Sequence, residues 1–201
     1  MNATAIIVAA GEGRRFGGET PKTFLSISGR PMLLRTLDRF FASRAIGKVI
    51  VVVADDQLSR AESLILSDSA LKDRFWVLQR GGATRQESVR RGLEMIGIDA
   101  DIIAIHDGAR PFVSSSLIDH AVEVAREKGA VVVGLPVRDT IKVVSAEHWI
   151  ESTPARSSLW EIQTPQVFRR QVILAAHAWG EREGIDVTDD AMLVEKIGER
   201  V

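Results

Sequence analysis

The chain has no cysteine among its 201 residues, and aromatic residues make up 5% of the sequence. The absence of cysteine excludes disulfides, cysteine nucleophiles and thiolate metal sites, and it is compatible with a reducing compartment. Long hydrophobic runs are also missing, because no apolar segment approaches the roughly 18 residues that a membrane-spanning helix requires. The chain begins directly with a strand pattern, without the basic segment and cleavage site of a secretory signal. We therefore expect a cytoplasmic protein that has no membrane partner.

Charge of one sign is not in excess. The 26 Lys and Arg residues nearly balance the 27 Asp and Glu residues, which gives a formal net charge of -1. Such a balance provides no global basic field for nucleic acid. Hydrophobic residues at 45% and charged residues at 26% are typical of a globular domain. We expect a single domain over residues 1–201 that has no nucleic-acid partner.

Common patterns for nucleophiles and metal ligands are absent as well. The G-x-S-x-G motif does not occur, and no serine, histidine and aspartate set stands out. The histidines do not have the spacing of a metal site: His106, His120, His148 and His177. This absence suits phosphoryl chemistry, in which catalysis depends mainly on positioning and electrostatic stabilisation.

What the sequence does contain is a regular alternation of apolar runs and helical patterns. Runs rich in Val and Ile predict strands at Ala5–Ala9, Lys48–Ala54, Phe75–Leu78, Asp101–His106 and Ala130–Leu135. Helical patterns lie between them, at Pro31–Ser43, Asp56–Ser67, Thr84–Ile96 and Ser116–Lys128. The runs are continuously apolar, which is typical of strands covered on both faces. The sequence therefore predicts an α/β fold with a Rossmann-like, doubly wound, mostly parallel sheet.

The pattern changes after Pro136. Two short apolar stretches with polar interruptions, Ile141–Val144 and His148–Glu151, predict a protruding β-arm at about residues 137–158. The arm has too little apolar content for a core of its own, so we expect it to pack on another surface, such as a second subunit. The remaining expected elements are a strand at Leu159–Gln163, ending at Thr164-Pro165-Gln166, and helices near Arg169–Glu183 and Thr188–Ile197.

The most informative segment follows the first predicted strand. It reads Ala9-Ala10-Gly11-Glu12-Gly13-Arg14-Arg15-Phe16 and is closed by Pro21-Lys22. Glycines let backbone N–H groups approach an anion closely, and the arginines and the lysine add positive charge. The segment is not a Walker A motif, and it is a poor dinucleotide fingerprint because Phe16 stands where a glycine or alanine is needed. We interpret it as a polyphosphate-binding loop, the alternative being a tight turn with solvated arginines.

Other polar loops follow predicted strands at their carboxyl ends, where α/β sheets bind ligands. They are Gly81–Ser88, Asp107–Pro111 and Pro136–Thr140. The first could recognise a base, or it could be a well-capped helix start in which Ser88 only packs. Asp107 could bind Mg²⁺, which takes one or two carboxylates with phosphate oxygens and waters, or it could hydrogen-bond its own loop. Together these loops suit a nucleotide with a metal ion.

Two further polar features have plainer interpretations. His106 should point to the opposite face of its strand from Asp107, and we expect it to be packed or hydrogen-bonded. The segment Thr188-Asp189-Asp190 is most simply a helix N-cap with favourable first-turn charges.

Taken together, these motifs closely resemble the 2-C-methyl-D-erythritol 4-phosphate cytidylyltransferase family. The resemblance implies transfer of CMP from CTP to methylerythritol phosphate with release of pyrophosphate, in the non-mevalonate isoprenoid pathway. It also implies a Mg²⁺ ion and a homodimer whose β-arms exchange across the interface. The matching segments run in order along essentially the whole chain: Ala9–Phe16 with Pro21-Lys22, Gly81–Val89, His106–Pro111, Pro136–Lys142 and Thr164-Pro165-Gln166.

The resemblance also implies roles for individual residues. The catalytic residues that stabilise the transition state would be Arg15 and Lys22. The nucleotide would be bound by Ala9, Ala10, Gly11 and Gly13 at its phosphates and sugar, and by Gly82, Ala83 and Ser88 at its cytosine. The polyol phosphate would be bound by Asp107, Arg110, Thr140, Arg156 and Thr164, some of them from the partner's arm. Asp107 would also contact the metal.

The chain departs from the family pattern at its C-terminus. The family continues with a strand and a loop containing Asn-Ile-Lys, whereas this sequence stops at Glu199-Arg200-Val201. Loss of one preorganised charge-stabilising group typically costs on the order of 10² to 10³ in rate. We therefore expect the 201-residue form to be catalytically impaired unless another segment supplies the lysine.

Three alternatives remain open. A cytidylyltransferase for another polyol phosphate, such as ribitol 5-phosphate, would differ only in its acceptor pocket. A nucleotidyltransferase for a sugar 1-phosphate or a cofactor would prefer another nucleotide. A regulatory CTP-binding form would bind CTP without releasing pyrophosphate.

Overall fold

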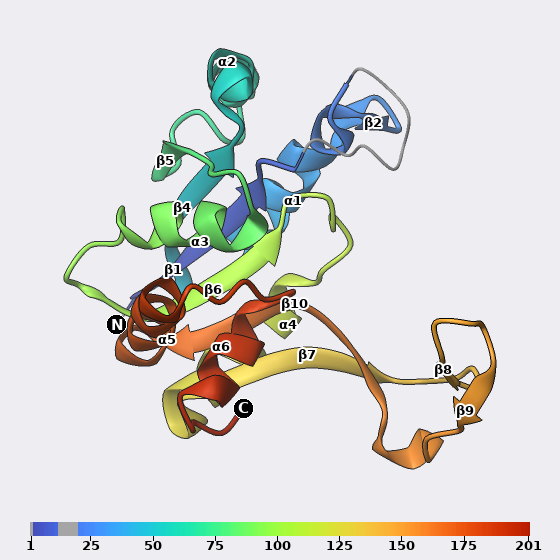
Figure 1. The fold of residues 1–201 in the computed structure, drawn as a ribbon. Helices are drawn as coiled ribbons and strands as arrows, with labels where there is room; N and C mark the ends of the chain where they lie inside the picture. The colour runs from blue at the N-terminus through green and yellow to red at the C-terminus, as the bar shows by residue number, and fades with distance from the viewer. Residues whose placement is uncertain (1, 12–19) are drawn as a thin grey trace.

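A six-stranded sheet forms the centre of the molecule (Figure 1). The computed structural model describes residues 2–11 and 20–201. The strands of this sheet are β1 (Asn2–Ala9), β4 (Ile46–Val53), β5 (Trp76–Arg80), β6 (Ala100–Asp107), β7 (Ala130–Pro136) and β10 (Trp160–Arg169). They lie in the order β5-β4-β1-β6-β10-β7. β1 pairs in parallel with β4 and β6, and β4 pairs in parallel with β5, which confirms the expected α/β arrangement.

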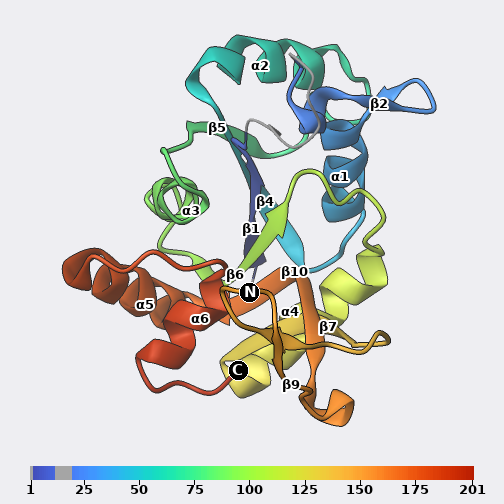
Figure 2. The same cartoon turned by 45° about the vertical axis from the view of Figure 1, so that its right-hand side comes forward.

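Helices cover both faces of the sheet. They are α1 (Met32–Phe41), α2 (Leu58–Ser67), α3 (Arg85–Leu93), α4 (Ser115–Lys128), α5 (Arg170–Glu183) and α6 (Asp190–Lys196). Apolar side chains of α1, α2 and α4 pack in one cluster with Ile7 and Val51, and those of α3, α5 and α6 pack in a second cluster with Ile6 and Ile50. Figure 2 shows α3, α5 and α6 on one side of the sheet and α1 on the other. Because successive side chains of a strand point to opposite faces, continuously apolar strands fill both clusters.

Local sequence signals set several helix ends. Thr84 is the N-cap of α3, and its hydroxyl accepts a hydrogen bond from the Glu87 N–H at 3.1 Å. Glu87 reaches back to the N–H of Ala83 at 2.7 Å, one residue before the position of a standard capping box. Gly129 follows α4 with a φ of 99°, a conformation that favours glycine. These signals confirm the helix limits to within a few residues.

The strand β10 differs from the sequence-based expectation. We predicted a strand that ends before Thr164, but β10 continues to Arg169 and pairs antiparallel with both β6 and β7. Its register with β7 shifts between Gln163 and Gln166. Pro165 lies at that irregularity. Proline has no backbone N–H to donate, and it is tolerated here because the regular hydrogen-bond ladder is already interrupted. The polar Thr-Pro-Gln segment is therefore a break inside a buried strand, and it brings Thr164 to the carboxyl end of β6.

The β-arm leaves the sheet between β7 and β10 and extends away from it (Figure 1). It contains β8 (Val143–Val144) and β9 (Ile150–Ser152), which pair antiparallel, and the 3-10 turn η4 (Arg156–Ser158). Several of its apolar side chains are exposed, including Trp149 at 76%. The other short elements are η2 (Lys22–Phe24), β2 (Ser26–Ile27), β3 (Arg30–Pro31) and η3 (Asp55–Gln57). No helix within the described ranges has both the length and the apolar character that crossing a membrane requires.

Candidate active site

The carboxyl ends of β1, β5 and β6 meet closely. Gly81, directly after β5, has so little space that a Cβ built on it would lie 2.4 Å from the Cβ of Ala10. A Cβ built on Gly108, directly after β6, would lie 3.0 Å from the Cβ of Ala9. A side chain at Gly81 would force its surroundings to shift, and one at Gly108 would press on its neighbour, so both glycines favour the close approach of these backbones. The structure thus brings the predicted nucleotide residue Ala10 beside the Gly81–Ser88 loop and Ala9 beside the loop that follows β6.

Ser88 shapes that loop from inside the protein. Its buried hydroxyl accepts a hydrogen bond from the Gly82 N–H at 3.0 Å and donates one to the Thr84 carbonyl at 2.9 Å. The Arg91 guanidinium donates to the Gly81 carbonyl at 2.6 Å. The backbone of Gly82 and Ala83 is therefore held in one shape by groups of its own helix. A direct contact between the Ser88 hydroxyl and cytosine stays a prediction.

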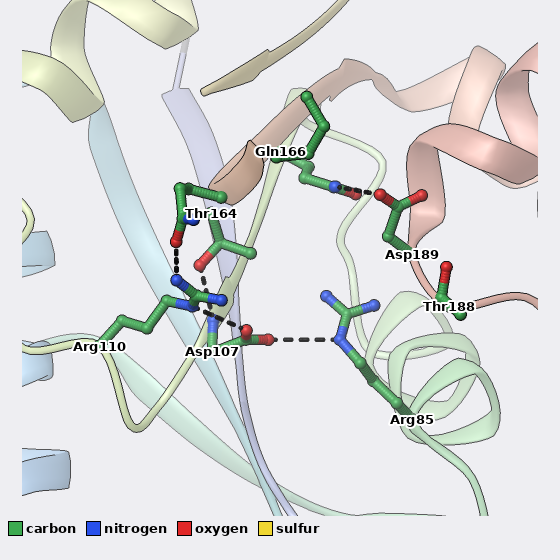
Figure 3. A pocket seen from close by; sticks show the side chains of 9 residues that line it. Arg85, Asp107, Arg110, Thr164, Gln166, Thr188 and Asp189 are labelled. Carbon is green, nitrogen blue, oxygen red and sulfur yellow. Dashed lines mark hydrogen bonds and ion pairs between the residues drawn. The ribbon is translucent and has the colours of Figure 1, made fainter. Parts of the chain in front are cut away.

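A polar pocket of about 220 Å³ lies between β6, β10, α3 and the start of α6 (Figure 3). We call it the Asp107 pocket, after the carboxylate at its centre. Three predicted substrate residues come together in it, from two strands and a loop: Asp107, Thr164 and Arg110. Its other lining residues are Arg85, Ile162, Gln163, Gln166, Thr188 and Asp189.

Two guanidinium groups flank the carboxylate of Asp107. Arg85 Nε lies 3.3 Å from Asp107 Oδ1, and Arg110 Nε lies 3.1 Å from Oδ2 (Figure 3). The backbone N–H of Asp107 donates to the Thr164 hydroxyl at 3.3 Å, and Arg110 also donates to Gln163. Asp189 also lines the pocket, so two arginines and two carboxylates balance in charge there. Each guanidinium carries five N–H donors, so donors remain for an anionic ligand. Such a site is suited to a phosphate that also carries hydroxyl groups.

Behind Arg85 lies a buried carboxylate, Asp190. Arg85 Nη1 donates to Asp190 Oδ2 at 2.7 Å, and His177 Nε2 lies 3.0 Å from Oδ1. Burial alone would raise the pKa of Asp190, but the His177 hydrogen bond and the Arg85 charge outweigh it and hold the pKa below its usual value. Burial also acts against the charge of Arg85, yet Asp190 and Asp107 raise its pKa above the usual value. The carboxylate and the guanidinium are therefore both charged.

Gln166 ties this buried group to β10. Its side-chain oxygen accepts hydrogen bonds from the N–H groups of Asp190 at 3.0 Å and Ala191 at 3.1 Å. Its amide nitrogen donates to Asp189 Oδ2 at 3.2 Å. Asp189 Oδ1 accepts from the Met192 N–H at 3.0 Å, so Asp189 is the N-cap of α6 that the sequence predicted. We assigned neither Arg85 nor Gln166 a role from the sequence, although both lie within segments singled out there, Gly81–Ser88 and Thr164-Pro165-Gln166.

His106 is packed, as expected. Its ring is fully buried, lies 4.9 Å from the Phe40 ring, and its Nε2 donates to the Arg110 carbonyl at 3.0 Å. Burial lowers the pKa of His106 to about 4, so the side chain is neutral near pH 7. His106 therefore supports the backbone of the Arg110 loop. It does not line the Asp107 pocket, whereas Asp107 does.

The remaining predicted residues lie elsewhere. Lys22 begins the half-buried turn η2, which packs against α1. Thr140 and Arg156 belong to the β-arm and do not line the Asp107 pocket of their own chain, and Arg156 donates to the Arg138 carbonyl at 2.7 Å. Gly11 lies just after β1, and a Cβ built on it would meet none of the described residues within 4 Å. The predicted residues outside the described ranges are Gly13 and Arg15.

Comparison with known proteins gives a consistent result. The family model described as 2-C-methyl-D-erythritol 4-phosphate cytidylyltransferase matches residues 3–201. A protein of that name from Caldanaerobacter subterraneus subsp. tengcongensis is 40% identical over 201 residues, which is 100% of this chain and 88% of the relative. Another from Carboxydothermus hydrogenoformans is 40% identical over 197 residues, covering 98% of this chain and 83% of the relative.

Solved structures of similar proteins share the fold. The 4-diphosphocytidyl-2C-methyl-D-erythritol synthase of Anaerococcus prevotii superposes with a TM-score of 0.86 at 28% identity, covering 98% of this chain and 83% of that one. The 2-C-methyl-D-erythritol 4-phosphate cytidylyltransferase of Thermus thermophilus superposes with a TM-score of 0.78 at 35% identity. The match covers 100% of this chain and 87% of the Thermus chain.

Proposed function

The chain belongs to the 2-C-methyl-D-erythritol 4-phosphate cytidylyltransferase family, and from that premise we propose which residues perform its reaction. It is a nucleotidyltransferase that transfers CMP from CTP to 2-C-methyl-D-erythritol 4-phosphate in the isoprenoid pathway and releases pyrophosphate. The observation that carries the assignment of residues is the Asp107 pocket, which opens beside the glycine-rich ends of β1 and β5. One edge of the sheet thus offers adjoining sites for two anionic substrates.

The nucleotide occupies the loops after β1 and β5. Ala9, Ala10 and Gly11, with Gly13, present backbone N–H groups to the triphosphate and the ribose. Cytosine lies against the backbone of Gly82 and Ala83, whose shape Ser88 maintains through the hydrogen bonds described above. The absence of side chains at the glycines lets the ring edge approach these backbone groups.

The acceptor occupies the Asp107 pocket. Asp107 and Thr164 accept hydrogen bonds from the polyol hydroxyls, and Arg110 binds the phosphate by charge-assisted hydrogen bonds. One phosphate oxygen of the acceptor attacks the α-phosphorus of CTP, and the bond from that phosphorus to the pyrophosphate oxygen breaks. A phosphate with a second pKa near 6 is already ionised at pH 7, so the step needs no general base. Arg15 and Lys22 stabilise the charge that develops on the triphosphate.

A Mg²⁺ ion bound with the triphosphate fits this site. The Asp107 carboxylate is 30% exposed, and each of its oxygens accepts one bond from an arginine. An ionised carboxylate offers about four acceptor positions, so capacity for a cation remains. No group of three or more potential ligands exists in the part of the chain that the structure describes. Asp107 would therefore hold the ion together with phosphate oxygens and waters, and the bound ion would neutralise phosphate charge.

A homodimer would complete the site. The β-arm exposes apolar side chains, among them Trp149 at 76% and Ile150 at 64%, which a partner subunit would cover. Thr140 and Arg156 would then reach the Asp107 pocket of the partner subunit rather than that of their own chain. The lack of cysteine and the polar, phosphorylated substrates suit a cytoplasmic enzyme.

Pyrophosphate release tests this function. The purified protein is given CTP and Mg²⁺ with 2-C-methyl-D-erythritol 4-phosphate, ribitol 5-phosphate or a sugar 1-phosphate, and CTP is replaced by UTP or ATP in parallel. We expect the highest kcat/KM with CTP and methylerythritol phosphate. A preference of about tenfold or more for ribitol 5-phosphate would reassign the acceptor. CTP binding without pyrophosphate release from any acceptor would indicate a regulatory form.

A further inference from the structure

We propose that Asp190 is a positioning residue for the transfer reaction, and that it acts through Arg85 on Asp107. The inference rests on the proposed function, because it names a residue that prepares the acceptor site. Asp190 does not line the Asp107 pocket. Its carboxylate contacts Arg85 and His177, and of these two Arg85 lines the pocket, so we assign the effect of the carboxylate on the substrate to that guanidinium.

The geometry of Arg85 carries the first step. This arginine begins α3, and its side chain bridges two carboxylates that are far apart in the sequence. The bond to Asp190 is the shorter at 2.7 Å, and the bond to Asp107 is the longer at 3.3 Å. Only 1% of the Asp190 side chain is exposed, against 30% for Asp107. A charge-assisted bond to a buried carboxylate is stronger than one to a solvated carboxylate, so Asp190 is the primary anchor of Arg85.

The carboxylate of Asp190 is not required to form α6. Asp189 provides the N-cap, and Gln166 accepts the N–H groups of Asp190 and Ala191. A buried carboxylate without such a structural task costs stability unless charged or hydrogen-bonding partners compensate for its desolvation. Arg85 and His177 supply that compensation. The buried charge of Asp190 is therefore not needed for α6, and we assign it the role of holding Arg85.

The consequence falls on Asp107. With Arg85 drawn toward Asp190, Asp107 keeps acceptor capacity for a polyol hydroxyl. If Asp190 loses its charge, Asp107 becomes the stronger carboxylate partner of Arg85, and the bond between Arg85 and Asp107 shortens. Both oxygens of Asp107 already accept from an arginine, and the shorter bond would hold Arg85 more firmly on Oδ1, where it competes with a polyol hydroxyl. We expect weaker binding of the acceptor and little change in the binding of CTP, whose proposed contacts lie at the ends of β1 and β5.

The test compares three variants and their matched control. Asp190→Asn keeps the shape of the side chain, and Arg85→Gln removes the guanidinium; the double variant combines them. Arg90→Gln is the control, because Arg90 also lies on α3 and pairs with Glu94 and with Glu181 of α5, at 3.0 and 3.3 Å. It does not line the pocket. For each protein, kcat and the KM of each substrate are measured, together with acceptor binding by calorimetry and the thermal unfolding midpoint.

We expect Asp190→Asn to raise the KM of methylerythritol phosphate by about tenfold, the effect typical of a lost hydrogen bond to a charged group. The KM of CTP and kcat should change by less than about twofold. The double variant should be no worse than Arg85→Gln, because both changes interrupt the same chain of contacts. Arg90→Gln should retain the KM of both substrates.

Three results would overturn the inference: additive losses in the double variant, equal increases in the KM of both substrates, or wild-type KM in Asp190→Asn. If Asp190→Asn does not fold, Arg85→Lys replaces it, since a lysine keeps the charge but lacks the fork that bridges two carboxylates. Arg85→Lys should raise the KM of the acceptor, and unchanged KM would contradict the inference. An inactive wild-type enzyme would instead refute the proposed function, so the two failures are distinguishable.

Discussion

The carboxyl edge of the central sheet and the β-arm both carry residues that we assign to the active site, but they hold them differently. At the sheet edge, Ala9 and Asp107 are the last residues of β1 and β6, whose side chains are mostly buried, such as Ile6 and Ile105 at 0% exposure. In the β-arm, Arg156 follows β8 and β9, which are strands of two and three residues. Ile150 of β9 is 64% exposed. Packing within the chain therefore fixes the first set of residues. The second set has less packing within the chain, and the proposed partner subunit would supply the rest.

An isoleucine-to-alanine substitution in each region should give the largest difference, and the quantity that differs is the free energy of unfolding. Ile50→Ala removes buried methyl groups between β1 and β5 and should lower the free energy of unfolding by about 2–5 kcal/mol. Ile150→Ala in the β-arm should lower it by less than about 0.5 kcal/mol. Urea denaturation, at protein concentrations low enough to dissociate dimers, measures both. Comparable losses in the two variants would show that the arm is packed within its own chain.

Loss of Lys22 sharpens the comparison at the sheet edge. Lys22→Ala should lower kcat on the order of 10² to 10³, because one preorganised charge-stabilising group is removed. The matched control is Lys48→Ala, since Lys48 lies near the start of β4, at the opposite edge of the sheet, and donates to the Met95 carbonyl at 3.0 Å. Its kcat should stay within about twofold of wild type. Retained turnover in Lys22→Ala would remove this residue from the proposed mechanism.

The two regions should also respond differently to pH. Burial lowers the pKa of His106 from 6.5 to about 4 in the folded protein. Because the unfolded chain binds the proton more tightly, the stability that the neutral ring contributes is complete above about pH 6.5 and is lost as pH falls toward 4, by about 3 kcal/mol. Urea unfolding between pH 7 and 4, without CTP or Mg²⁺, measures the loss.

The controls for this pH effect come from both regions. His106→Gln should flatten the dependence of stability on pH by removing the titrating ring. His148→Asn changes an exposed histidine of the β-arm, where φ is 66°, and asparagine tolerates that conformation. It should leave the dependence as in wild type. A wild-type slope in His106→Gln would assign the acid sensitivity to another group.

The sequence predicted the parts of the fold that depend on local pattern. Continuous apolar runs located β1, β4 and β6 to within a few residues, and Thr84 and Gly129 marked helix ends. It failed for β10, since Thr164 and Pro165 read as the end of a strand when only neighbours in sequence are considered. The pairing that carries β10 onward, with β6 and β7, comes from distant segments.

The candidate site shows the same division. Asp107 and Arg110 could be placed together because both follow one strand at the carboxyl edge of the sheet, whereas Thr164 was assigned through the family resemblance. The bond between Arg85 and Asp190 joins residues 105 positions apart, and no periodicity or motif spacing relates them. Each residue had a sufficient local explanation, as part of a helix start. Only the packing of α6 against the rest of the fold, fixed by Gln166, reveals the pair.

The smallest expected effect concerns the β-arm itself. Arg156→Ala should lower kcat/KM for methylerythritol phosphate by about tenfold, through the loss of one charged contact to the acceptor phosphate. Steady-state kinetics with each substrate varied in turn measures it. The KM of CTP should be unchanged, because the arm carries none of the residues assigned to the nucleotide. An equal loss for both substrates would contradict the assignment of the arm to the acceptor.

Mixing two defective variants decides whether the β-arm serves its own chain or the partner. Lys22→Ala and Arg156→Ala each have an impaired site. If Arg156 reaches the pocket of the partner subunit, a mixed dimer has one site with both defects and one site with neither. Random reassociation makes about half of the dimers mixed, so activity should recover to about a quarter of wild type. If the arm serves its own chain, every site keeps one defect, and mixing should restore nothing.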